Sequence, residues 1–247
     1  MTLKTRILTA AAALALTACG GATQPKPGCT IGQGEFAAKY TLKAGETTSG
    51  SCAALKGELI NLRDYSNQQG TNFVAIRSAN LGAHRGSCVD PTAANYPCSI
   101  GEFPTESNNQ NFCVMPTLTP ARVQLPASGS APAVDKTYEW SDVQVLVTSR
   151  AAGTQIKANL KYTDAVSGCT ANYDVVAMWP GINCATTVNG VKTADNTKCA
   201  TKADPAKGIK IGCSAGGFCL SPDIKTYCDP EIFLCVLDGT PPVLNDE

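Results

Sequence analysis

The clearest pattern in the chain is an alternation of apolar and polar residues over residues 137–179. Three runs repeat it, separated by short segments of small and polar residues. A period of two is typical of strands that bury one face and expose the other. We therefore predict a three-stranded antiparallel meander. Its apolar sets are Tyr138, Trp140, Val143, Val145 and Val147; Ile156, Ala158, Leu160 and Tyr162; and Ala171, Tyr173, Val175, Ala177 and Trp179.

The breaks in this pattern predict where the meander bends and turns. The apolar register of the first strand shifts across Ser141-Asp142, which indicates a β-bulge. We place one turn at Ala151-Ala152-Gly153 and a second over residues 164–168, which ends in a glycine.

Weaker patterns precede the meander. Residues 36–42 alternate and predict a strand, as do residues 73–78. Residues 52–65 fit either a helix or a strand. Since Gly57 interrupts the helical spacing and costs about 1 kcal/mol in a helix relative to alanine, we prefer a strand over residues 58–64.

The remaining segments are rich in residues that favour loops. Gly, Pro, Asn and Ser recur over residues 81–134, which we expect to be mostly loop. Cysteine-rich loops follow Pro180, with a last short strand over residues 232–237. These elements predict an all-β fold whose antiparallel meander forms a sandwich or a small barrel, with a disulfide-stapled, loop-rich C-terminal region.

The N-terminus has the organisation of an export signal. Lys4 and Arg6 precede an apolar run, Ile7 to Leu16, that is shorter than the roughly 20 residues needed to span a bilayer. The run ends in Leu16-Thr17-Ala18-Cys19, which resembles the bacterial lipobox. The resemblance implies cleavage of residues 1–18 and lipidation of Cys19, for example with palmitate. The alternative is an ordinary secretory signal.

The anchor predicts how the mature chain is arranged. Residues 19–28 contain glycines and two prolines and suit a flexible tether, and residues 29–247 would form a single disulfide-rich β domain. The predicted partner is the membrane, reached through the N-terminal lipid. Gly20 stands where an Asp would retain a lipoprotein in the inner membrane of enteric bacteria. This favours the outer membrane, on its periplasmic or its exposed face.

Cysteine usage supports an oxidising compartment. The chain has 13 cysteines, and 12 remain once Cys19 is set aside. An even number in an exported chain predicts disulfides rather than free thiols. No Cys-x-x-Cys pair occurs and the chain has one histidine, so we predict no metal site and no cofactor. The candidate disulfide residues are Cys29, Cys52, Cys88, Cys98, Cys113, Cys169, Cys184, Cys199, Cys213, Cys219, Cys228 and Cys235.

The distribution of these cysteines constrains their pairing. Five lie before a Pro/Ser/Ala stretch at residues 126–134 and seven lie after it. Because both numbers are odd, full pairing requires at least one disulfide between the two groups. The charge adds a further exclusion. The sequence holds 20 basic and 20 acidic residues and has no basic face, so we expect no nucleic-acid partner.

Catalytic motifs are missing from the sequence. Gly-x-Ser-x-Gly, the P-loop and His-Glu-x-x-His do not occur. His84 could act as a base or contact a ligand, but its glycine-flanked segment favours an exposed loop histidine. The carboxylates of Glu139, Asp142, Asp164 and Asp174 are expected to be solvated. The aromatic residues Tyr138, Trp140, Tyr173 and Trp179 could line a ligand site in a barrel mouth, although their register favours the core.

Several segments beside the lipobox form a recognisable combination. They are Tyr138-Glu139-Trp140-Ser141-Asp142-Val143, Asp204-Pro205-Ala206-Lys207-Gly208, Cys228-Asp229-Pro230 and Leu234-Cys235-Val236. With these segments, the chain resembles the cysteine-containing lipoproteins predicted in myxobacteria and related delta-proteobacteria. The resemblance would cover most of the mature chain, but it implies no activity and transfers no functional residue.

The sequence therefore favours an outer-membrane-anchored lipoprotein that serves as a non-catalytic binding or envelope-interaction module. Its partner would be another envelope protein or a small ligand. One alternative is a small-ligand carrier with an apolar barrel interior. Another is an exported hydrolase that uses His84 or a carboxylate pair.

Overall fold

A computed structural model describes residues 26–47, 49–84, 88, 93 and 95–245 of the chain. The predicted signal peptide, the lipid-acceptor Cys19 and most of the tether lie outside the described residues. Among the described residues, no helix has the length and apolar character needed to cross a bilayer.

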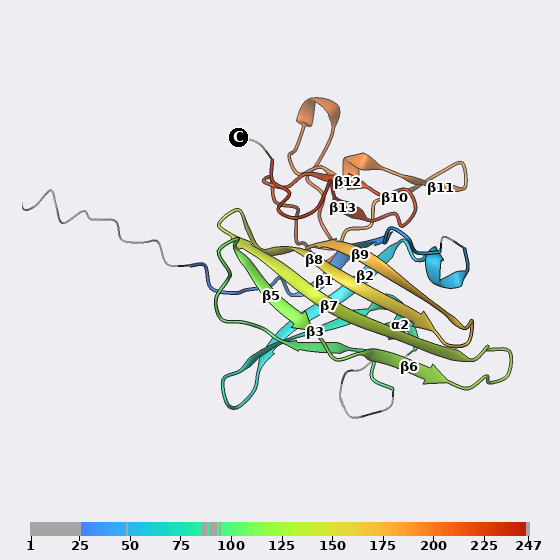
Figure 1. Ribbon diagram of the computed structural model, residues 1–247. Coiled ribbons are helices and arrows are strands. Elements are labelled where there is room, and N and C mark those ends of the chain that lie inside the picture. The colour runs from blue at the N-terminus through green and yellow to red at the C-terminus, as the bar shows by residue number, and fades with distance from the viewer. Residues whose placement is uncertain (1–25, 48, 85–87, 89–92, 94, 246–247) are drawn as a thin grey trace, which may run out of the picture.

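Nine strands form one antiparallel sheet that curls into a nearly closed barrel (Figure 1). Eight follow the order β4-β3-β2-β1-β9-β8-β7-β5, and β6 also pairs with β7. The strands are β1 (Gly34–Leu42), β2 (Gly57–Ser66), β3 (Asn72–Ser78), β4 (Ser99–Glu102), β5 (Phe112–Thr117), β6 (Ala121–Leu125), β7 (Val134–Thr148), β8 (Ala151–Asp164) and β9 (Cys169–Met178). A 3-10 helix, η1 (Ser51–Ala54), precedes β2, and a short helix, α2 (Ala79–His84), follows β3.

Contacts between β4 and the segment around β6 narrow the gap between the two ends of the curled sheet. The backbone N–H of Thr119 donates to the carbonyl of Ile100 at 2.8 Å, and the Ile100 N–H donates to Oγ1 of Thr119 at 2.9 Å. An isolated bridge joins Tyr96 to Arg122. The predicted all-β class is thus confirmed, and of the two predicted architectures the chain adopts the barrel.

Large side chains fill the barrel interior. Tyr138 and Tyr173 are fully buried, and Trp140 is 3% exposed. Tyr40 packs edge-on against Trp140, with the ring centroids 6.2 Å apart. These aromatic residues point inward because strand alternation places every second side chain on one face, and there they build a packed hydrophobic core.

The meander is confirmed, with one turn in a different place. β7 shifts register between Ser141 and Gln144, where the bulge was predicted. The first turn is at Ser149-Arg150, however, and β8 already begins at Ala151. Gly153 is a strand residue whose φ of +73° and lack of a side chain let the N-terminal segment pass. A Cβ there would lie 2.5 Å from the carbonyl oxygen of Thr30.

Residues 81–134 were expected to be mostly loop, and three short strands that were not predicted interrupt this loop. This segment contains β4, β5 and β6, and helix α2 begins just before it. The three strands span four to six residues each, too few to produce a convincing alternation. The Pro/Ser/Ala stretch at residues 126–134 is the connection between β6 and β7, and Ser128 bridges Ala131 within it.

The C-terminal region, residues 181–245, packs on the barrel beside β1 and β9 (Figure 1). Its apolar cluster includes Ala37 of β1 and Met178 of β9. The last strand was predicted over residues 232–237, and the observed strand, β13, is shorter because it begins only at Cys235. The elements of the region are β10 (Ala185–Val188), β11 (Val191–Ala194), η2 (Asn196–Cys199), η3 (Pro205–Lys207), β12 (Thr226–Cys228) and β13 (Cys235–Leu237).

Twelve cysteines form six disulfides among the described residues. Three lie before residue 181 and three lie after it, and none joins the two parts. The bond between Cys52 and Cys169 crosses the 126–134 stretch, as the parity of the cysteine groups requires. The pairs are Cys29–Cys113, Cys52–Cys169, Cys88–Cys98, Cys184–Cys228, Cys199–Cys235 and Cys213–Cys219.

Candidate functional site

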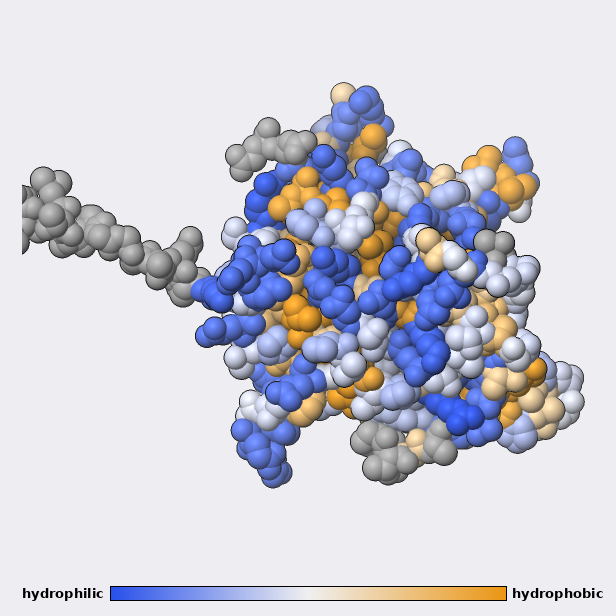
Figure 2. Space-filling model, in the orientation of Figure 1, coloured by the Kyte–Doolittle hydropathy of each residue, from blue (hydrophilic) through white to orange (hydrophobic). Residues whose placement is uncertain are grey.

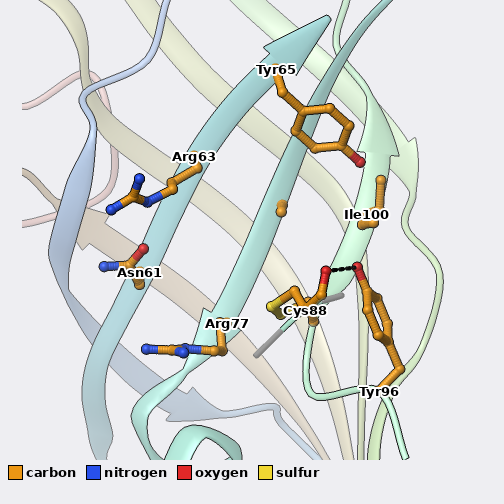
Figure 3. A pocket seen from close by; sticks show the side chains of 9 residues that line it. Asn61, Arg63, Tyr65, Arg77, Cys88, Tyr96 and Ile100 are labelled. Atoms are coloured by element: carbon orange, nitrogen blue, oxygen red, sulfur yellow. Dashed lines mark hydrogen bonds between the residues drawn. A yellow bond between two sulfur atoms is a disulfide. The ribbon is translucent and has the colours of Figure 1, made fainter. Parts of the chain in front are cut away.

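A pocket of about 660 Å³ lies on the outer face of the sheet, over β2, β3 and β4 (Figure 3). Alternation along the strands builds it, because the residues between the core positions of β2 and β3 point outward. The lining residues are Asn61, Arg63, Tyr65, Ala75, Arg77, Cys88, Tyr96, Cys98 and Ile100.

Ala75 sits at the centre of this face. It pairs in register with Arg63 of β2 and with Ile100 of β4. Its methyl group is the smallest side chain in the lining, so the longer neighbours surround a hollow above it. Cys88 and Tyr96 come from the segment that leads into β4, where Tyr96 donates its hydroxyl hydrogen to the Cys88 carbonyl at 3.5 Å.

The pocket has a polar side and an aromatic side. In Figure 3 the side chains of Asn61, Arg63 and Arg77 point toward one side, and the rings of Tyr65 and Tyr96 lie on the other. The Tyr65 ring stacks on Phe73 at a centroid distance of 5.5 Å, which holds it in place. An apolar surface with a few convergent polar groups is typical of small-molecule sites.

The lining carries positive charge. Arg63 and Arg77 contribute two guanidinium groups, and no carboxylate lines the pocket among the described residues. Glu35 pairs with Asn61 from the β1 side and Glu102 pairs with Phe73 from the β4 side, so both carboxylates flank the pocket, and neither is among its lining residues. Arg77 also takes part in a further interaction of its own.

A second polar cluster centres on Glu58 of β2. Its carboxylate accepts hydrogen bonds from the hydroxyls of Tyr40 at 3.1 Å and Tyr138 at 3.0 Å, and from the Asn80 N–H at 2.6 Å. Burial raises the pKa of Glu58, while these hydrogen bonds and the Lys136 ammonium oppose the shift. Because Asn80 belongs to α2, the cluster fastens that helix to the barrel.

The five predicted ligand-contacting residues all lie away from the pocket. Tyr138, Trp140 and Tyr173 belong to the barrel core. Trp179 follows β9, donates its Nε1 hydrogen to the Gln33 carbonyl at 2.9 Å and packs against Phe218. His84 is half-buried, and it is the last residue of α2 rather than a loop residue. It has no hydrogen-bond partner within the described residues.

The four carboxylates considered for a catalytic pair each have a different partner. Glu139 binds Lys161 at 2.7 Å, and Asp174 lies 3.5 Å from the Lys43 ammonium. Asp142 accepts a hydrogen bond from Gln144. Asp164 accepts N–H groups from the turn that follows β8. Each carboxylate therefore has its own partner, and only Asp142 and Asp174 are brought to one shared pocket.

Three sulfur atoms also gather in the C-terminal region. The Sγ atoms of Cys184, Cys199 and Cys235 lie within 4.8 Å of one another. Cys184 bonds Cys228, and Cys199 bonds Cys235, so the group consists of two disulfides packed side by side.

Two exposed valines lie away from the pocket. Val188 and Val191 are 53% and 62% exposed at the tip of the β10–β11 hairpin, which projects at the upper right in Figure 2. The two residues flank the turn Asn189-Gly190. Lys192 follows Val191 in β11, and its ammonium lies 4.3 Å from the centre of the Phe233 ring.

Apart from Cys88 and Cys98, which were named as disulfide candidates, the pocket residues were not singled out from the sequence, although part of the signal was present. Asn61 and Arg63 occupy the outward positions of the strand predicted over residues 58–64, and Arg77 does so in the strand over residues 73–78. Neither the pairing of β3 with β4 nor the bond between Cys88 and Cys98 can be deduced from spacing alone.

Comparison with known proteins gives the chain a context. The model of the MlpA family matches residues 34–180, which is more than half of the chain and runs from β1 to just past β9. A predicted lipoprotein named MlpA in Myxococcus xanthus is 28% identical over 221 residues, which is 87% of this chain and 84% of that protein. No solved structure matches.

Proposed function

Because the chain belongs to the MlpA family, we propose that it is a lipid-anchored protein of the bacterial outer membrane whose barrel acts as a non-catalytic binding module. The binding site in this proposal is the pocket over β2, β3 and β4. The matched segment contains every lining residue, so the site belongs to the family's part of the chain.

The lipid anchor is supported by the sequence and by the relative. Leu16-Thr17-Ala18-Cys19 follows an apolar run in the lipobox arrangement, and the Myxococcus xanthus protein is itself named as a lipoprotein. The seven residue-to-residue steps from Cys19 to Lys26 can extend over at most about 25 Å. The barrel would therefore stay close to the membrane surface.

The pocket is the observation that carries the binding role. Its volume of about 660 Å³ falls within the range of roughly 300–1,000 Å³ that small-molecule sites occupy. The barrel interior is filled by its own aromatic residues, such as Tyr138 and Trp140. The outer pocket is therefore a better ligand site than the interior that a barrel-type carrier would use.

A neutral fluorescent dye tests the binding role. N-phenyl-naphthylamine, titrated into the folded protein, should bind with a saturable component. Ala75→Leu places three more carbon atoms in the hollow and should abolish that component. The matched control is Ala152→Leu, at an exposed position of β8 outside the pocket lining, which should leave it unchanged. Equal dye binding by wild type and Ala75→Leu would refute the pocket as the site.

Metabolic labelling tests the anchor separately. Cells that express the full chain should incorporate labelled palmitate into it, and Cys19→Ser should abolish the label. Gly20→Asp should keep the label and, in an enteric host, move the protein to the inner-membrane fraction. Incorporation that survives Cys19→Ser would contradict the anchor.

A further inference from the structure

We propose that the ligand of this pocket is a small amphipathic anion. Its apolar or aromatic body would lie against Tyr65, and its carboxylate, phosphate or sulfonate group would bind the Arg63 guanidinium. The inference rests on the proposed function in one respect, that the pocket is a binding site, and it goes further by assigning the chemistry of the ligand.

Arg63 is the residue that points to an anion. It is exposed, and its guanidinium forms no hydrogen bond or ion pair with another described residue. Other arginines of the protein are paired: Arg122 lies 2.8 Å from Asp135, and Arg150 lies 3.3 Å from Asp223. A guanidinium group offers five N–H donors in a planar fork that matches a carboxylate or a phosphate.

A second arginine, Arg77, lies close to Arg63 on the neighbouring strand. Arg77 occupies the diagonal position on the adjacent strand, because Arg63 pairs with Ala75 and Arg77 lies two residues further along β3. Diagonal neighbours are about 7–8 Å apart at Cα, within reach of long side chains. Arg77 already takes part in another interaction, so the contact with the anion is assigned to Arg63.

The opposite side of the pocket favours a ring. Tyr65 is 43% exposed, yet its stacking on Phe73 fixes its orientation before any ligand arrives. Ile100 and Tyr96 extend the apolar surface across β4. A preordered aromatic surface binds a flat molecule with little additional ordering cost. The volume of about 660 Å³ limits the occupant to one small molecule.

Two dyes that share a ring system separate charge from shape. Anilinonaphthalene sulfonate carries an anionic group, and N-phenyl-naphthylamine lacks it. Both should bind the wild-type protein. Arg63→Gln should weaken binding of the sulfonate about ten-fold or more, which corresponds to the loss of one charged hydrogen bond. It should change binding of the neutral dye by less than about two-fold.

Two further variants complete the design. Arg122→Gln removes an arginine from outside the pocket and should leave both dyes unaffected. Tyr65→Ala removes an exposed ring and should weaken both dyes. Because this position is exposed, the variant should fold even if Ala75→Leu does not. The melting temperature of each variant should lie near that of the wild type.

The outcomes separate this inference from the proposed function. If Arg63→Gln leaves the sulfonate affinity unchanged, or weakens both dyes equally, the anion assignment is wrong. The pocket would then survive as a site for a neutral ligand, provided that Tyr65→Ala still weakens both dyes. If Tyr65→Ala and Ala75→Leu leave both dyes unchanged, the proposed binding site and this inference fail together.

Discussion

The Lys39 ammonium of β1 lies 2.8 Å from the Asp229 carboxylate of the C-terminal region, and it also donates to the Tyr227 hydroxyl at 2.6 Å. A second polar contact joins the same two parts of the protein. The Gln155 side chain of β8 donates to the Val243 carbonyl and accepts from the Val243 N–H, both at 2.9 Å. Together with the apolar contacts, these bonds hold the C-terminal region against the barrel.

Lys39→Met should weaken the contact between the barrel and the C-terminal region. It leaves the Asp229 carboxylate without its cation, although the Asp229 side chain is only 5% exposed. We expect a loss of about 2–4 kcal/mol in the free energy of unfolding, measured by denaturant titration. Lys161→Met, which breaks the more exposed pair with Glu139, should cost less than about 1 kcal/mol. Equal losses in the two variants would contradict the role of Lys39.

The same ion pair predicts sensitivity to acid. Burial raises the pKa of Asp229, but the Lys39 ammonium and two backbone N–H groups outweigh it and leave the pKa below its usual value. The unfolded chain therefore binds the proton more tightly. The stabilisation is complete above the ordinary pKa of about 3.9 and disappears as the pH falls through the folded value. The unfolding free energy of Asp229→Asn should fall less steeply below pH ~4 than that of the wild type.

Glu58 should show the opposite dependence. Because burial raises the pKa of Glu58, the folded protein holds this proton more tightly than the unfolded chain does. Its contribution to stability is greatest below the ordinary pKa and declines as the pH rises through the folded value. Relative to Glu58→Gln, the wild type should lose stability over that interval, measured as melting temperature against pH. A constant difference between the two proteins would show that the carboxyl titrates alike in both states.

Two glycines with similar φ angles separate backbone strain from crowding. Gly168, with φ +65°, has open space around it, and Gly168→Ala should cost about 1–2 kcal/mol. Gly153, with φ +73°, faces the backbone of Thr30 and Ile31. Gly153→Ala should therefore cost a further ~1–3 kcal/mol from overpacking. Chemical denaturation of both variants measures the difference, and equal costs would mean that the N-terminal segment moves aside freely.

The disulfides should contribute differently to the free energy of unfolding, according to the length of the loop that each one closes. Cys52 and Cys169 are 117 residues apart, whereas Cys213 and Cys219 are only six apart. Loop-closure entropy assigns about 5 kcal/mol to the long loop and about 2 kcal/mol to the short one. Replacing both cysteines of each pair by alanine, followed by thermal denaturation, should reproduce this order. The reverse order would show that local packing outweighs chain entropy.

The sequence predicted the long elements of the fold better than the short ones. β7, β8 and β9 each span ten residues or more, so their alternation is clear and even the bulge near Ser141 could be located. β4 has four residues and β5 contains Pro116, and both were assigned to loop. Pairing with neighbouring strands stabilises these short segments, and such distant partners leave no local signal.

Only part of the candidate site could be predicted from the sequence. The outward positions of Arg63 and Arg77 follow from the predicted strands. Their importance depends on Ala75 lying between Arg63 and Ile100, which requires the register of three strands. Gly153 shows the same limit. Its presence suggested a turn. A glycine is required there because the backbone of Thr30 and Ile31, more than 100 residues away in the sequence, passes too close for a side chain.

The separation of the disulfides into two sets has a consequence for the covalent topology of the molecule. Every sulfur–sulfur bond among the described residues stays on its own side of residue 181, so the peptide backbone near Pro180 is the single covalent path between the barrel and the C-terminal region. One proteolytic cut there would divide the chain into two fragments, each still internally cross-linked. The fragments would stay together only through non-covalent contacts, which include the apolar interface, the ion pair between Lys39 and Asp229 and the hydrogen bonds between Gln155 and Val243. A denaturant without any reductant would separate them.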